Sequence, residues 1–115
     1  MSNECIFCKM IKGEMQANIV YEDDLIIAIE DINPQAPVHL LLIPKKHIPT
    51  TMDIQKEDSD ILSDIFESAK HLAKEKKIDE SGFRIVLNCN EGAGQSVFHI
   101  HFHLLGGRRM TWPPG

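Results

Sequence analysis

Apolar residues recur along this chain in two spacings, and these spacings predict its helices and strands. Continuous or alternating apolar runs indicate five strands, over 18–22, 25–30, 38–43, 83–89 and 99–105. Residues 53–77 instead carry apolar side chains at helical spacing, with acidic residues at the start and lysines at the end. Residues 5–11 predict a short helix that ends at Gly13. We therefore expect an α+β fold, a five-stranded antiparallel sheet with the long helix on one face.

Composition fits one small globular domain. The chain has 115 residues, 43% of them hydrophobic and 25% charged, so we expect one domain over 1–115 with a single core. The net charge of −5 argues against a nucleic-acid partner bound through its phosphates. No segment is apolar enough for a membrane span, and the first residues do not form a signal peptide. We therefore expect a cytoplasmic protein with no membrane or nucleic-acid partner.

Three histidines stand at alternate positions in the run HIHFHLL. On a strand, His99, His101 and His103 share one face, and the apolar residues between them face the core. A single histidine on a strand is commonly structural. Three on one face favour a chemical role, because imidazole serves as base, acid, nucleophile and metal ligand.

The segment before these histidines, NEGAGQS, helps to choose among those roles. Gly92 and Gly94 let backbone N–H groups approach an anion, and the Ser96 hydroxyl can donate to a phosphate oxygen. A short glycine-rich stretch is more often a plain turn, and histidines also bind zinc. Next to three histidines on one face, the segment favours phosphate chemistry.

The run HIHFHLL resembles the H-x-H-x-H-x-x motif, with x hydrophobic, of the histidine triad superfamily of nucleotide hydrolases and transferases. Three further blocks resemble the Hint branch of that superfamily: CIFCKMIKGE, DINPQAPVHLLLIPKKHI and GQSVFHIHFHLLGGRRMTWPPG. Together they cover nearly the whole chain. The resemblance implies a HIT-like fold and a hydrolase that cleaves the P–N bond of purine nucleoside 5′-phosphoramidates, releasing AMP or GMP.

The same resemblance implies a role for each polar residue near the triad. His101 is the nucleophile and forms a nucleotidyl-histidine, and His103 stabilises charge on a phosphate oxygen. His39 orients and polarises His101. Ser96 donates to the phosphate or to the leaving nitrogen, and His99 is a support residue.

Further residues are candidates for binding the nucleotide. Asp31 accepts hydrogen bonds from the ribose hydroxyls in the family, although an Asp at the start of a loop also bonds its own backbone. Asn88 could reach ribose or phosphate in the same way. The other candidates are apolar residues for the base and residues of the loop before the triad: Ile6, Phe7, Ile29, Leu41, Gly94 and Gln95. For the four apolar residues, the sequence alone favours a plain core.

The pair Cys5 and Cys8 forms a single CxxC, which fits a zinc half-site, a redox pair or coincidence. His47 and His99 would complete a closed structural zinc site. Members of the family that look bacterial carry such a set. The chemistry itself needs no metal, so we expect any zinc to be structural. Cys89 is expected as an unpaired thiol, buried near the end of a strand.

The C-terminal tail RRMTWPPG predicts assembly. A tryptophan close to a chain end is typical of an interface, and a strand such as 83–89 at a sheet edge needs a partner. We expect a two-fold homodimer, as the resemblance also implies, with Trp112 near the active site of the other subunit.

Three alternatives remain at this point. The first is another branch of the superfamily, a dinucleoside polyphosphate hydrolase or a nucleotidyltransferase, which the WPPG tail and His103 respectively disfavour. The second is a non-catalytic nucleotide-binding or scaffold protein. The third is a metalloenzyme that uses the three histidines as ligands.

Overall fold

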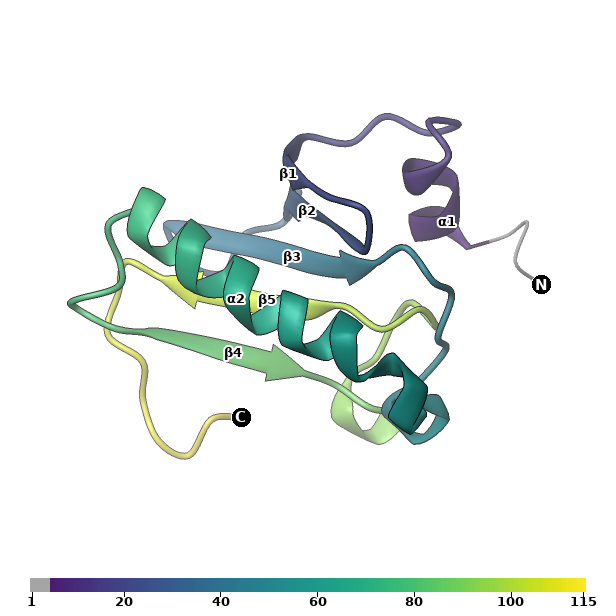
Figure 1. The fold of residues 1–115 in the computed structure, drawn as a ribbon. Coiled ribbons are helices and arrows are strands. Elements are labelled where there is room, and N and C mark those ends of the chain that lie inside the picture. The colour runs from purple at the N-terminus through teal and green to yellow at the C-terminus, as the bar shows by residue number, and fades with distance from the viewer. Residues whose placement is uncertain (1–4) are drawn as a thin grey trace.

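The computed structural model describes residues 5–115, which form one sheet with a helix on each side of it (Figure 1). Residues 1–4 of the expected domain lie outside the described part. The strands pair in the order β1-β2-β3-β5-β4, all antiparallel, which confirms the predicted fold class. In chain order the helices and strands are α1 (Ile6–Ile11), β1 (Ile19–Glu22), β2 (Ile26–Glu30), β3 (Val38–Pro44), α2 (Ser59–Glu75), β4 (Phe83–Leu87) and β5 (Phe102–Gly106).

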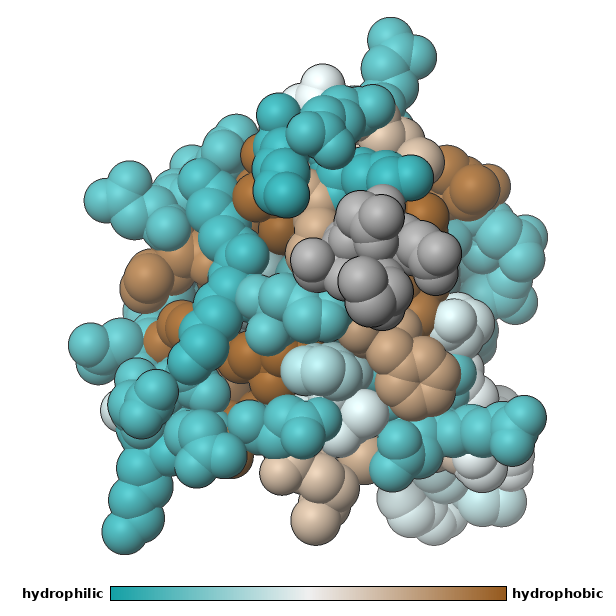
Figure 2. All heavy atoms as spheres, turned by 90° about the vertical axis from the view of Figure 1, so that its right-hand side faces the viewer, coloured by the Kyte–Doolittle hydropathy of each residue, from teal (hydrophilic) through white to brown (hydrophobic). Residues whose placement is uncertain are grey.

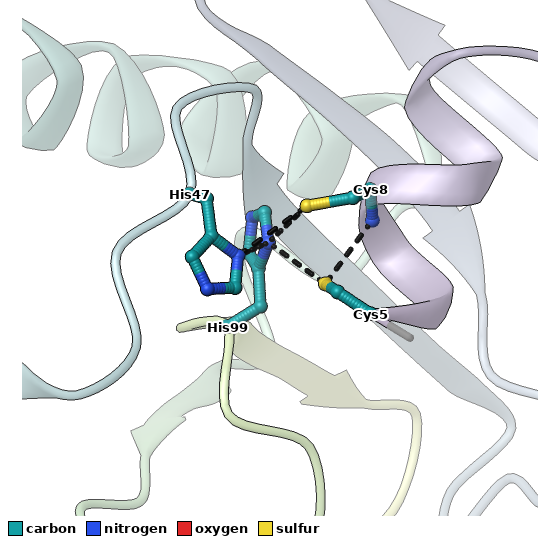
Figure 3. Close-up of side chains that lie close together, drawn as sticks. All are labelled: Cys5, Cys8, His47 and His99. Carbon is teal, nitrogen blue, oxygen red and sulfur yellow. Dashed lines mark hydrogen bonds between the residues drawn. The ribbon is translucent and has the colours of Figure 1, made fainter. Parts of the chain in front are cut away.

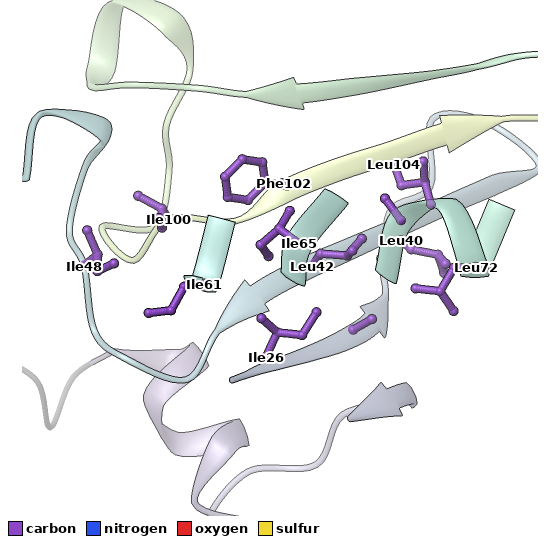
Figure 4. Close-up of a cluster of buried hydrophobic side chains, with 12 residues drawn as sticks. Ile26, Leu40, Leu42, Ile48, Ile61, Ile65, Leu72, Ile100, Phe102 and Leu104 are labelled. Atoms are coloured by element: carbon purple, nitrogen blue, oxygen red, sulfur yellow. The ribbon is translucent and has the colours of Figure 1, made fainter. Parts of the chain in front are cut away.

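The main core lies between α2 and one face of the sheet (Figure 4). Ile61, Ile65 and Leu72 line the inner face of α2, and the last two are fully buried. They pack against alternate residues of β2, β3 and β5, such as Leu42 and Leu104. Each such side chain contributes roughly 1.5–3 kcal/mol on burial. The spacing that predicted the helix therefore also gives the face that it buries.

The long helix begins at Ser59, later than the predicted start at residue 53. Two short 3₁₀ turns, Thr51–Asp53 and Lys56–Asp58, precede it. The Asp53 carboxylate accepts the Thr50 backbone N–H, and the Asp58 carboxylate accepts the Gln55 backbone N–H. These acidic residues therefore cap separate turns, which competes with one continuous helix.

The last strand also begins later than predicted, at Phe102 and not at His99. The neighbouring strands pair with β5 only as far as Phe102, which faces Leu42 on one side and Leu87 on the other. Before that point, the Ile100 N–H donates to the Ile48 carbonyl. The predicted alternation nevertheless holds, because Ile100, Phe102 and Leu104 belong to the core under α2.

A second, smaller cluster covers the opposite face of the sheet, where α1 packs. Phe7 from α1 contacts buried side chains of β2 and β3, among them Ile29 and Leu41. Figure 2 looks at the end of the molecule that carries α1, and it shows a mostly hydrophilic surface with scattered apolar side chains. None of the helices in residues 5–115 combines the length and apolar character that crossing a bilayer requires.

Candidate active site

His101 is the histidine whose hydrogen bonding best suits a nucleophile. Its Nδ1 lies 2.9 Å from the backbone carbonyl of His99, which can only accept. Nδ1 therefore carries the proton, and Nε2 carries the lone pair. The ring is 7% exposed and packs edge-on against Phe7, with centroids 5.0 Å apart. Burial lowers the pKa of His101, which favours the neutral ring.

His103 and His39 form a chain of hydrogen bonds that starts at the backbone. The Gln35 N–H donates to His39 Nδ1 at 3.0 Å, so the neutral ring of His39 carries its proton on Nε2. His39 Nε2 lies 2.9 Å from His103 Nδ1, which accepts that proton's hydrogen bond. His103 therefore presents Nε2–H as a donor. Burial first, and then the rings of His101 and His39, lower the pKa of His103 to about 4.

The partner of His39 differs from the predicted one. His39 was expected to orient His101, whereas its hydrogen bond goes to His103. The reason is register: His103 pairs with Leu41 on β3, next to His39 on the same face of the sheet. His39 thus acts on His103, and the His99 carbonyl acts on His101.

Asp31 lies beside this chain. One carboxylate oxygen is 3.3 Å from His39 Nε2, and the other accepts the Asn33 backbone N–H at 2.8 Å. The second contact is the local turn that an Asp at a loop start was expected to make. A carboxylate has about four acceptor positions, so both contacts leave capacity for ribose hydroxyls.

Four further side chains, Cys5, Cys8, His47 and His99, converge at the end of the sheet (Figure 3). Cys5 caps α1 and accepts the Cys8 N–H through its sulfur. His99 Nδ1 lies 3.3 Å from Cys5 Sγ, 3.5 Å from Cys8 Sγ and 3.1 Å from His47 Nδ1. Cys8 Sγ lies 3.3 Å from His47 Nδ1. We call these four residues the Cys/His cluster.

The Cys/His cluster fits a tetrahedral metal ion. Zinc bound to two sulfurs and two nitrogens holds these atoms about 3.3–3.8 Å apart, close to the separations seen here. His99 Nε2 lies 2.7 Å from the Pro44 carbonyl and donates to it, so Nδ1 directs its lone pair into the cluster. Burial and the neighbouring Cys5 raise the pKa of Cys8 to about 11, so two thiolates here call for a bound cation.

The loop before the triad is held by Gln95, a predicted nucleotide-binding residue. The side chain of Gln95 is buried and fully used within the protein. It accepts the Asn90 N–H at 2.7 Å and donates to the carbonyls of Pro49 and Val97. Gln95 therefore shapes the loop, a role that its sequence context does not signal. Its neighbours Gly94 and Ser96 are exposed, as the phosphate role requires.

The predicted base-binding residues divide into two kinds. Phe7, Ile29 and Leu41 are at most 7% exposed and belong to the second apolar cluster, as a plain core would. Ile6 is 37% exposed at the start of α1. Asn88 is half-buried just after β4. A ligand could thus reach Ile6 and Asn88 directly. The other three form the buried layer on the sheet face where α1 packs.

Two features of the C-terminal half bear on assembly. β4 lies at one edge of the sheet, as predicted for a strand that needs a partner. Trp112 is 81% exposed in the single chain, and the Thr111 carbonyl before it accepts a hydrogen bond from Arg84 on β4 at 3.0 Å. Cys89 is only half-buried, so the expectation of a buried thiol is wrong: the residue lies past the end of β4, where the core stops.

Comparison with known proteins places this arrangement in a family. Residues 4–111 match the family model described as "Scavenger mRNA decapping enzyme C-term binding". A purine nucleoside phosphoramidase from Escherichia coli is 46% identical over 110 residues, which cover 96% of this chain and 92% of the relative. A 14 kDa zinc-binding protein from Brassica juncea is 49% identical over 97% of this chain and all of the relative.

A solved structure agrees with these relatives. The HIT family hydrolase from Legionella pneumophila superposes with a TM-score of 0.95 at 55% identity, covering 97% of this chain and all of the other. This chain therefore belongs to the histidine triad (HIT) family and is a hydrolase of that family.

Proposed function

We propose that this protein hydrolyses the P–N bond of purine nucleoside 5′-phosphoramidates, with His101 as the nucleophile. The observation that carries the proposal is the hydrogen bond from His101 Nδ1–H to the His99 carbonyl, which fixes a lone pair on Nε2. The similarity to the E. coli purine nucleoside phosphoramidase supports the substrate class.

In the first step, His101 Nε2 bonds to phosphorus and the P–N bond breaks. The leaving nitrogen takes up one proton and departs as an amine. The nucleotidyl-imidazolium that forms is cationic, and the His99 carbonyl, 2.9 Å from Nδ1, stabilises its N–H. In the second step, water adds its oxygen to phosphorus, the P–Nε2 bond breaks, and one proton returns to solvent with release of the nucleoside monophosphate.

The surrounding residues stabilise charge and bind the nucleotide. His103 Nε2–H donates to a phosphate oxygen, and His39 keeps that proton in place by donating to Nδ1. Ser96 donates to the phosphate or to the leaving nitrogen. Asp31 and Asn88 bind the ribose.

The purine lies against the apolar face formed by Ile6, Phe7, Ile29 and Leu41, and AMP or GMP is the product. Gly94 allows the loop backbone to approach the phosphate.

We also propose that the Cys/His cluster holds one structural zinc ion. The geometry of its four ligand atoms and the similarity to a plant zinc-binding protein support this assignment. When bound, zinc would fix α1 and His99 in place, and it takes no part in the chemical steps. Reduced cysteines suit a cytoplasmic location, which is part of the proposal.

Trapping the covalent intermediate tests the proposed function. The protein is mixed with adenosine 5′-phosphoramidate, quenched in alkali and digested for mass spectrometry. We expect an adenylyl group on His101, no such group in His101→Gln, and a normal yield in the control His71→Asn, whose ring is exposed on α2. Turnover without a nucleotide on any histidine would overturn the proposal.

The assembly proposed for this chain is a two-fold homodimer joined along β4, with Trp112 beside the partner's active site. The exposed edge of β4 and the exposed Trp112 support it. Light scattering should report twice the chain mass of 13.0 kDa. In Trp112→Ala, unchanged relative rates on bulky and small amines would contradict the cross-subunit role.

A further inference from the structure

We propose that His99 is a positioning residue that couples the Cys/His cluster to the nucleophile, so that metal occupancy of the cluster sets the turnover of His101. This inference rests on the proposed function and adds regulation of the same site. It follows from contacts that connect the cluster to His101 along three separate routes.

The first route runs through His99 itself. Its Nδ1 faces the sulfurs of Cys5 and Cys8, and its Nε2–H donates to the Pro44 carbonyl at 2.7 Å. The backbone carbonyl of the same residue accepts the hydrogen bond of His101 Nδ1 at 2.9 Å. One fully buried residue thus holds a metal-ligand position and fixes the proton of the nucleophile.

The second route runs through the backbone next to His47. The carbonyl of Ile48 accepts the Ile100 N–H at 2.8 Å. Ile48 directly follows one residue of the cluster, and Ile100 lies between His99 and His101. A shift of His47 would therefore pull on the segment that carries the nucleophile.

The third route runs through α1. Phe7 stands between Cys5 and Cys8 on this short helix of six residues. Its ring lies 5.9 Å from the ring of His99 and 5.0 Å from the ring of His101, edge-on to both. A metal ion that ties both cysteines to His99 would also press Phe7 onto the nucleophile.

These contacts predict which kinetic constant responds. The ribose-binding candidates Asp31 and Asn88 lie outside the cluster, whereas Ile6 and Phe7, placed against the purine, stand on α1 between its two cysteines, so loss of metal should weaken binding only in part. A nucleophile displaced by about 1 Å can lose roughly a hundredfold in rate. We therefore expect kcat to fall by about 10–100-fold, a larger factor than the rise in KM.

The cluster is open to reagents, which makes the test practical. Cys5 and His47 line a cavity of about 430 Å³ together with Ile6, Pro49 and Ser96.

The test compares His47→Asn with His71→Asn, a matched change at an exposed histidine on α2. Each protein is measured for zinc by elemental analysis, for kcat and KM on adenosine 5′-phosphoramidate, and for the His101 Nδ1–H resonance by NMR.

We expect His47→Asn to lose zinc, to lose kcat by a larger factor than KM rises, and to lose the His101 Nδ1–H signal, while His71→Asn keeps the wild-type zinc content, kinetics and signal. A folded, zinc-free His47→Asn with wild-type kcat and an unchanged signal would overturn the coupling. If the variant does not fold, stripping zinc from the wild type with a chelator and restoring it gives the same comparison. Cys8→His, which keeps four ligands, should retain the signal.

The NMR signal separates this inference from the proposed function. A wild type with no turnover of the phosphoramidate would refute the proposed substrate. The coupling would still be supported if removal of zinc abolished the His101 Nδ1–H signal, and refuted if the signal stayed.

Discussion

Two groups of converging side chains flank His101, and they differ in what their histidines can bind. In the Cys/His cluster, His99 Nε2–H donates to the Pro44 carbonyl, so Nδ1, which faces the cysteines, offers a lone pair. In the group of Asp31, His39 and His103, the donor atoms also lie within 4.8 Å of one another. There, however, His39 Nδ1 accepts the Gln35 N–H, so Nε2, which faces His103, offers a proton.

This difference suits the first group to a metal ion and the second to a chain of hydrogen bonds. A metal ion on His39 Nε2 would leave Nδ1 protonated against the Gln35 N–H, two donors facing each other. The same ion between His99 and the cysteines meets only lone pairs and sulfur. The backbone group behind each ring, rather than the set of ligand types, decides which chemistry each region supports. The contrast also disfavours the alternative of a metalloenzyme that uses the triad as ligands.

Replacing the residue between the two regions should have the largest effect. We expect His101→Gln to lose about 10⁴- to 10⁶-fold in turnover, because the covalent route is removed. Metal content and binding of AMP should stay close to the wild type, since His101 belongs to neither group of donors. Steady-state rates, elemental analysis and calorimetry with AMP measure the three quantities. Retention of more than about a tenth of the turnover would contradict the assignment of the nucleophile.

Removing the cysteines of the Cys/His cluster should give the next largest effect, a fall in the melting temperature. We expect the double variant Cys5→Ser and Cys8→Ser to bind no zinc and to melt about 10 °C or more below the wild type, because metal binding adds to the free energy of unfolding. Cys89→Ser is the matched control, since Cys89 lies outside the cluster. Thermal melts with metal analysis check this, and equal melting of the double variant and the control would refute the zinc site.

In the group of Asp31, His39 and His103, the effect should be a pH dependence of the free energy of unfolding. Burial first, and then the neighbouring rings, lower the pKa of His103 to about 4, below its ordinary value of 6.5. The unfolded chain therefore protonates the His103 ring at a higher pH than the folded chain does. The stability that the neutral ring contributes is complete above pH 6.5 and is lost as the pH falls toward 4. We expect His103 to account for on the order of 1–2 kcal/mol of the loss between pH 7.5 and 5.

Urea unfolding at the two pH values measures this loss, and His103→Asn should reduce it. His99, whose burial lowers its pKa to about 4 as well, contributes with the same sign in both proteins. An equal loss in the wild type and in His103→Asn would contradict the prediction.

A carboxyl pair away from both regions should give the smallest effect, with the opposite sign. Burial first, and then the adjacent Asp23, raise the pKa of Asp64 to about 6, and its Oδ2 is buried without a hydrogen-bond partner. The stability that Asp64 contributes is thus lost as the pH rises through 6. We expect Asp64→Asn to raise the free energy of unfolding by about 1 kcal/mol at pH 8, and by less at pH 5.

The exposed Asp60 on the same helix provides the control for this prediction. Asp60→Asn should change the free energy of unfolding equally little at both pH values. A destabilised Asp64→Asn at pH 8 would show that the two carboxyls do not repel in the folded protein.

Much of the site could be predicted from side-chain pattern. The alternation of His99, His101 and His103 with apolar residues places all three opposite the α2 core, and this holds although the paired strand begins only at Phe102. The four side chains of the Cys/His cluster also converge as their types suggested. In each case the signal is carried by side chains whose spacing or chemistry is unusual.

What could not be predicted depends on backbone groups. A backbone group decides which nitrogen of a ring is protonated: the His99 carbonyl for His101, the Pro44 carbonyl for His99 and the Gln35 N–H for His39. Every residue has such groups, so the sequence carries no signal for them. The same holds for Gln95, whose amide joins three loop segments through backbone atoms. The late start of α2 follows from Asp53 and Asp58 bonding locally.

The measurement that tests the central contrast most directly is assignment of the histidine ring nitrogens by ¹⁵N NMR, in zinc-loaded protein at pH 7.5. The structure predicts a proton on Nε2 and metal on Nδ1 for His99, a proton on Nδ1 for His101, and a proton on Nε2 for both His39 and His103. A proton on Nδ1 of His39, or on Nε2 of His101, would contradict the distinction between metal site and proton relay.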